Sequence, residues 1–125
     1  MGWIGESHVR VEMLTDGRTM RLLNPLAYED CDGVIWHGVI GDMVDGASIP
    51  RFFGRFIGSP FVGRYRRASV IHDVYCQTRT VASWRVHRVF YRIMIEDGVA
   101  RWKARIMWAA VATFGPTFMG SKWQN

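Results

Sequence analysis

The chain has 125 residues, of which 49% are hydrophobic and 14% aromatic, so it is too apolar for a disordered polymer and too short for two independent cores. Its 16 Lys and Arg outnumber its 11 Asp and Glu, which gives a formal charge of +5. That charge suits anionic partners and equally describes an ordinary solvated surface. We expect a single domain over residues 1–125.

The two cysteines, Cys31 and Cys76, lack the spacing of a disulfide framework, and we expect both to be reduced. The N-terminus, MGWIGESHVRVEM, has neither the basic start nor the apolar run of a secretory signal. We therefore expect the chain to be cytoplasmic when it is synthesised.

The first half of the chain has the patterning of β-structure. Residues 8–14 alternate polar and apolar side chains, residues 15–17 (Thr-Asp-Gly) supply a turn, and residues 19–23 form a return strand. A third strand is expected within residues 33–40, before Gly41. These elements predict a small antiparallel sheet.

The second half is helical after a glycine-rich loop, in which RFFGRFIG has the length of one or two helical turns. Residues 66–78 predict a helix with one apolar face, a second helix begins near Ser83 as its N-cap and ends at Asp97-Gly98, and a third covers about 100–114. Strands followed by three C-terminal helices indicate an α+β fold rather than alternating α/β.

The most apolar stretch, IMWAAVATFGPTFM, is shorter than the roughly 20 residues that span a bilayer. We interpret it as a core helix without a transmembrane role. Because Trp102, Trp108 and three basic residues accompany it, an interfacial membrane helix is the alternative.

Two short segments could carry chemistry. Asp45 and Ser48 flank a glycine where a strand ends, and the carboxylate could bind metal or act as a base, or both side chains could satisfy turn backbone. His72 and Asp73 lie within an apolar helix, where only one of them can face the core squarely, and His72 is the more buried candidate. Such a histidine is a metal ligand, a general base or a hydrogen-bonded core residue.

A zinc site is one alternative for these residues. His72 and Cys76 are four residues apart on one helix, and His87 on the next helix could add a third ligand. A nucleophilic Cys76 activated by His72 is disfavoured, because a helical cysteine is usually a small core residue.

Arginines form two groups that could contact phosphate or a carboxylated polymer. With the neighbouring aromatic residues they make nucleic-acid binding a weaker alternative. The groups are Arg51, Arg55, Arg64, Arg66 and Arg67 around the loop, and Arg85, Arg88 and Arg92 on the second helix.

The segment GDMVDGASIPRFFGRFIGSPFVGRYRRASVIHDVYCQT resembles the signature of the domain of unknown function 1353 family, over about residues 34–98. Residues 45–51 match its first block, and the second is matched by Ala68, His72, Asp73 and Tyr75. Departures are Val44 in place of Thr, Cys76 after Tyr75, and Val86-His87 where the family has Ala-Asp.

The resemblance implies a phage or prophage origin and a site shared by the Asp-Gly-Ala-Ser loop and the His-Asp helix. One hypothesis is a hydrolase, acid–base or dependent on zinc or another divalent metal, directed at peptidoglycan. Asp45, His72 and His87 would hold the ion, Asp73 would support them or act as base, and Ser48 would orient the substrate or Asp45. The other is a non-catalytic virion or tail component that docks other phage proteins and uses the polar residues as a buried network.

Overall fold

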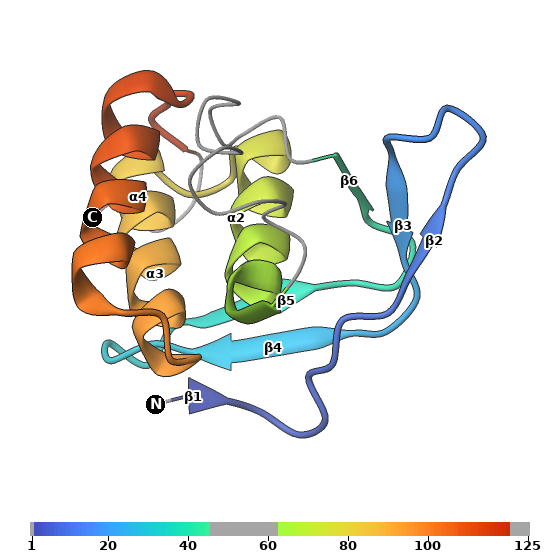
Figure 1. Cartoon of the computed structure of the whole chain (residues 1–125), viewed down its shortest axis with the longest axis horizontal. Helices are drawn as coiled ribbons and strands as arrows, with labels where there is room; N and C mark the ends of the chain where they lie inside the picture. Colours follow the sequence, from blue (N-terminus) through green and yellow to red (C-terminus); the bar gives the residue numbers. More distant parts are fainter. Residues whose placement is uncertain (1, 46–62, 121–125) are drawn as a thin grey trace. The chain divides into compact units, whose positions relative to one another are not determined.

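The computed structural model of the chain describes residues 2–45 and 63–120 (Figure 1). It divides the chain into two compact units, Met1–Asp45 and Gly46–Asn125, each of which is considered by itself. Ser48 and the RFFGRFIG segment lie outside the described residues. The predicted α+β class is confirmed, since antiparallel strands come first and helices follow.

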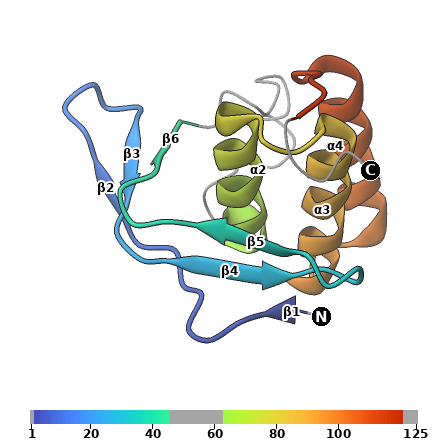
Figure 2. The same ribbon diagram turned by 180° about the vertical axis from the view of Figure 1, so that it is seen from behind.

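The first unit contains short strands in two antiparallel sheets, with orders β1-β4-β5 and β2-β3-β6. Figure 2 shows β4 and β5 side by side, with β1 along β4. The strands are β1 (Gly2–Trp3), β2 (Val11–Met13), β3 (Met20–Leu22), β4 (Leu26–Glu29), β5 (Ile35–Gly38) and β6 (Met43–Val44).

The predicted hairpin is β2 and β3, which pair with Met13 opposite Met20. Its turn is fixed by Asp16, whose carboxylate accepts hydrogen bonds from the backbone NH groups of Arg18 and Thr19 at 2.9 and 2.8 Å. The predicted third strand is β5, and it pairs with β4, which the sequence pattern does not predict. Strands β1 and β6 are not predicted either, since two residues are too few to show a period.

The second unit contains a 3-10 turn, η2 (Gly63–Tyr65), followed by α2 (Arg66–Thr78), α3 (Ser83–Glu96) and α4 (Arg101–Phe114). Helix α3 packs against both α2 and α4. It ends before Gly98, whose φ of 91° is a left-handed conformation that favours glycine. The three predicted helices are confirmed, with bounds close to those expected.

One detail of the helix predictions was wrong. Ser83 is the first residue of α3 and not its N-cap, which is Ala82; the Ser83 hydroxyl instead accepts a hydrogen bond from the backbone NH of Phe118 at 3.1 Å. Helix α4, interpreted as a core helix, contributes Ala104, Met107, Ala110 and Val111 to the core and exposes its other side.

Candidate functional site

Helix α2 places the His-Asp pair in an environment shielded from water. Every residue from Ala68 to Cys76 is buried, and His72 and Asp73 are 0% and 1% exposed. The expectation that only His72 would be deeply buried was therefore wrong. That expectation assumed that one side of α2 faces solvent, whereas all sides of the helix are buried over residues 68–76.

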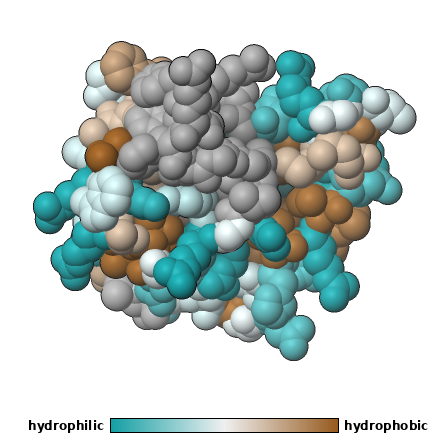
Figure 3. All heavy atoms as spheres, viewed as in Figure 1, coloured by the Kyte–Doolittle hydropathy of each residue, from teal (hydrophilic) through white to brown (hydrophobic). Residues whose placement is uncertain are grey.

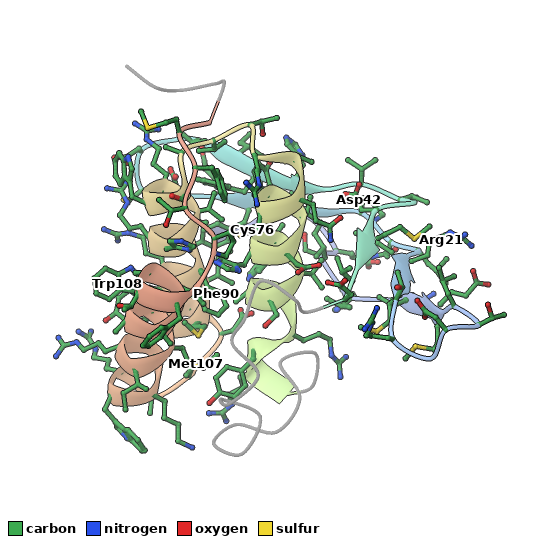
Figure 4. The ribbon with its side chains drawn as sticks, turned by 90° about the horizontal axis from the view of Figure 1, so that it is seen from above. Arg21, Asp42, Cys76, Phe90, Met107 and Trp108 are labelled. Atoms are coloured by element: carbon green, nitrogen blue, oxygen red, sulfur yellow. The ribbon has the colours of Figure 1, made fainter. Side chains whose placement is uncertain are left out.

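His72 meets His87 across the packed pair of helices α2 and α3. Nε2 of His72 lies 2.9 Å from Nδ1 of His87, and the two ring centroids are 5.1 Å apart. The His72 ring also packs on Phe90, with centroids 4.6 Å apart. Cys76 and Phe90, labelled in Figure 4, belong to α2 and α3 respectively. The structure thus brings together two of the three histidine and carboxylate side chains predicted as metal ligands.

The backbone at Pro116 determines which nitrogen atoms of this pair carry protons. The Pro116 carbonyl, which can only accept, lies 3.2 Å from Nε2 of His87. Nε2 of a neutral His87 therefore holds its proton, and its Nδ1 is the acceptor. Nε2 of His72 must then donate to that acceptor, so Nδ1 of a neutral His72 carries the lone pair.

Both imidazoles are held in their neutral forms. Burial, with a smaller repulsive contribution from His87, lowers the pKa of His72 to about 3. Burial also lowers the pKa of His87, and the hydrogen bond to the Pro116 carbonyl opposes that effect. With both rings neutral, the hydrogen bonds from His72 to His87 and from His87 to the Pro116 carbonyl can both form.

Cys76 is the third polar neighbour of the pair. Its Sγ lies 3.8 Å from Nδ1 and 3.7 Å from Nε2 of His72, at the edge of a sulfur hydrogen bond. Neither cysteine forms a disulfide, and the Cys76 thiol is buried whereas that of Cys31 is exposed. The burial of Cys76 agrees with its interpretation as a small core residue of the helix.

Asp73 and Ser69 extend the polar side of α2. Oδ2 of Asp73 accepts a hydrogen bond of 2.8 Å from Nε2 of Gln77. Ser69 lies one turn before Asp73 and is fully buried, and within the described ranges its Oγ has no hydrogen-bond partner. Sequence reasoning missed Ser69; its position four residues before Asp73 was the available signal.

Of the two loop residues of the predicted site, Asp45 and Ser48, only Asp45 lies in the described part of the chain. Asp45 is half-buried, follows β6 and belongs to the first unit, while Ser48 lies outside the described residues. The meeting of Asp45 and Ser48 with His72 therefore stays a prediction. Within residues 2–45 and 63–120, no three His, Cys, Asp or Glu side chains are arranged to hold a metal ion.

Two arginines of the loop group have structural partners. Arg67 forms a two-pronged ion pair with Asp97, with nitrogen–oxygen distances of 2.6 and 3.1 Å, which joins the start of α2 to the end of α3. Arg64 donates to the Gly98 carbonyl at 2.9 Å. These contacts explain part of the basic charge around the loop without an anionic ligand.

Comparison with known proteins assigns the chain to a family. The model of the family described as "Protein of unknown function (DUF1353)" matches residues 20–111, and the chain belongs to that family. The chain is 46% identical over 95 residues to uncharacterized protein y4jT and 41% identical over 107 residues to uncharacterized protein y4iH, both of Sinorhizobium fredii. No solved structure matches it.

The matches cover 76% and 85% of this chain but only 28% and 44% of those two relatives. The chain therefore spans less than half of the length of either relative. In the described part of the chain, no helix combines the length and the apolar character needed to cross a membrane.

Proposed function

We propose that the chain is a hydrolase-like domain in which His72 acts as the general base and His87 orients it. The observation that carries this proposal is the hydrogen-bond series from His72 through His87 to the Pro116 carbonyl. A general base needs a fixed tautomer and a second group that holds the ring, and this series supplies both. Nδ1 of His72 is the atom that would take a proton from a substrate hydroxyl that reaches this buried ring.

The geometry favours acid–base chemistry over a zinc site built on the two histidines. Two nitrogen ligands of a tetrahedral zinc with bonds of ~2.0–2.1 Å lie about 3.3 Å apart, with both lone pairs aimed at the metal. Nε2 of His72 and Nδ1 of His87 are 2.9 Å apart and face each other. Binding zinc through these atoms would require rotation of at least one ring. A divalent ion held through Asp45 or Asp73 is compatible with the proposal.

The remaining parts of the proposal concern origin and substrate. The resemblance of residues 34–98 to a phage and prophage pattern supports a phage- or prophage-encoded protein, made in the host cytoplasm and carried in the virion. A bond in peptidoglycan is the substrate class that such a protein would meet. Phage structural genes beside the coding gene would support that origin, and a neighbourhood without any would count against it.

The decisive experiment compares the native chain with His72→Gln on purified bacterial sacculi, with release of soluble muropeptides as the readout. Glutamine keeps an NH group that can donate toward His87, but it cannot accept a proton as imidazole does. We expect release by the native chain, loss of at least about a hundredfold in the variant, and an unchanged circular dichroism spectrum. Equal release by both proteins would reject His72 as the base.

The alternative is a non-catalytic virion or tail component, and a specific observation favours it. His72, Asp73 and His87 are all buried, as expected for a network that fixes α2 against α3. In that case His72→Gln would lower the free energy of unfolding by about 1–3 kcal/mol, and no hydrolysis of sacculi would be seen with either protein. Unfolding curves measured on the same two samples separate the alternatives.

A further inference from the structure

The outer side of α3 and α4 exposes large aromatic side chains. Trp84 on α3 is 58% exposed, and Trp102 and Trp108 on α4 are 57% and 43% exposed. Figure 4 labels Met107 and Trp108, neighbours on α4 of which the first is buried and the second exposed. An exposed tryptophan keeps a large apolar surface in contact with water, which is unfavourable. Three exposed tryptophans on one helix pair therefore indicate a binding surface.

Two of these side chains, Trp84 and Trp108, line a groove of about 630 Å³ between α3 and α4. Its walls are almost entirely apolar in spite of two arginines among the residues that line it. The lining residues are Trp84, Arg88, Tyr91, Arg105, Trp108 and Ala109. The groove belongs wholly to the second unit.

The same two helices carry a strong excess of positive charge. Helix α3 has three arginines and one acidic residue, Glu96, and α4 has two arginines, one lysine and no acidic residue. Several of the cations lie over the exposed rings: Arg85 and Arg88 are 5.3 and 5.4 Å from the Trp84 centroid, and Lys103 is 5.5 Å from that of Trp102. Aromatic and cationic groups are thus presented together.

The distribution of side chains along α4 points to one kind of partner. Its basic residues lie in the first half, while the second half exposes Trp108, Ala109 and Phe114, the last at 70%, and carries no charge. The hydropathy colouring of Figure 3 shows hydrophilic and apolar side chains intermixed over the part of the molecule that contains α4. A polyanion such as nucleic acid offers no apolar phase for the uncharged half, whereas a bilayer offers headgroup anions and acyl chains side by side.

We propose that the α3–α4 face docks on the surface of an anionic phospholipid bilayer. The tryptophan rings would lie at the level of the headgroups, Arg88 and Arg105 would pair with lipid phosphates, and the apolar walls of the groove would contact the upper acyl chains. Helices α3 and α4 would lie along the membrane surface and would not span the bilayer. This proposal is independent of the proposed hydrolase activity.

The test is co-sedimentation of the full chain with vesicles of phosphatidylcholine mixed with phosphatidylglycerol, compared with pure phosphatidylcholine. We expect binding to the mixed vesicles that weakens as salt is raised, with a blue shift of tryptophan emission. Arg88→Glu/Arg105→Glu should weaken binding about tenfold or more, and Trp84→Ser/Trp108→Ser should weaken it by a similar factor and remove most of the shift.

Matched controls use exposed residues of the first unit. Arg18→Glu, on the hairpin turn, and Ile40→Ser, which is 61% exposed, should bind the mixed vesicles as the native chain does. Failure of the native chain to sediment with anionic vesicles would overturn the proposal. So would equal losses in the control variants, or complete displacement from vesicles by a single-stranded oligonucleotide that binds more tightly to this face.

Discussion

Nε2 of His72 donates a hydrogen bond to Nδ1 of His87 over 2.9 Å, and this contact joins α2 to α3. Nδ1 of a histidine is as far along its side chain as Oδ1 of an aspartate, so either residue can accept the proton of His72 Nε2.

The first prediction concerns His87→Asp. A carboxylate at this position would stabilise the protonated form of His72, whereas His87 contributes to lowering its pKa. We expect the pKa of His72 to rise by at least about one unit and any hydrolytic activity near neutral pH to increase. Two-dimensional NMR of the imidazole protons across pH measures the first effect.

The control for that change is His87→Asn, which has the same size as aspartate without its charge. It should leave the pKa of His72 low. If Asp and Asn raised the pKa of His72 equally, the carboxylate charge would not be the cause, and the orienting role proposed for residue 87 would lose its electrostatic basis.

A second prediction is that the chain loses stability as the solution becomes acidic. A histidine in the unfolded chain has a pKa near 6.5, while that of His72 in the folded chain is lowered to about 3 and that of His87 is also lowered. Between these values the unfolded chain binds protons that the folded chain excludes, so the free energy of unfolding falls as the pH falls below about 6.5. Each buried histidine contributes a slope of at most about 1.4 kcal/mol per pH unit.

Urea unfolding at a series of pH values between neutrality and pH 4 measures that slope. His72→Gln removes one titrating group, and its stability should depend less on pH over the same interval. A native chain whose unfolding midpoint did not change between pH 7 and pH 5 would contradict the neutral, buried state of the pair.

A third prediction uses the two thiols. Cys31 is exposed and Cys76 is buried beside His72. A disulfide reagent such as Ellman's should therefore modify one thiol at once and the second only at the rate at which α2 opens. Cys31→Ser should abolish the fast phase and leave the slow one, while two equally fast thiols would show that α2 does not shield position 76.

The sequence carried enough information for the helices and much less for the strands. Residues 66–78 contain several turns of a 3.6-residue period, and α2 follows them, whereas β1 and β6 have two residues each and show no period at all. The strand β4 follows the Asn24-Pro25 break, which reads as a loop, and its assignment depends on pairing with β5. Pairing between segments is tertiary information that local patterning does not contain.

For the site, the sequence identified the residue types but not their contacts. His72 was predicted as a metal ligand, a general base or a hydrogen-bonded core residue, and His87 as a metal ligand. The hydrogen bond between them depends on how α2 and α3 pack and on the Pro116 carbonyl beyond α4. Outside this site, the sequence did not indicate that Asp30 is buried. It precedes the Asp32-Gly33 turn, where aspartate is common for local reasons, so nothing in the sequence distinguishes a buried carboxylate from an exposed one.

Asp30 therefore provides the fourth prediction. Its carboxylate, 6% exposed, accepts hydrogen bonds from the backbone NH groups of Asp32 and Val34 and from Nε1 of buried Trp36, at 2.9, 3.0 and 2.9 Å. Asp30→Ala would leave these donors without their acceptor in or near the core of the first unit. We expect a loss of about 2–4 kcal/mol in the free energy of unfolding, measured by urea titration.

Asp16 is the matched control, because it also accepts three hydrogen bonds, from the backbone NH groups of Arg18 and Thr19 and from the Thr19 hydroxyl, but is exposed. The Thr19 hydroxyl, with help from the two NH groups, lowers the pKa of Asp16 to about 2. Water can replace the lost acceptor at this turn, so Asp16→Ala should destabilise the chain much less than Asp30→Ala. Equal losses in the two variants would mean that the number of hydrogen bonds, and not their burial, sets the contribution of these aspartates to stability.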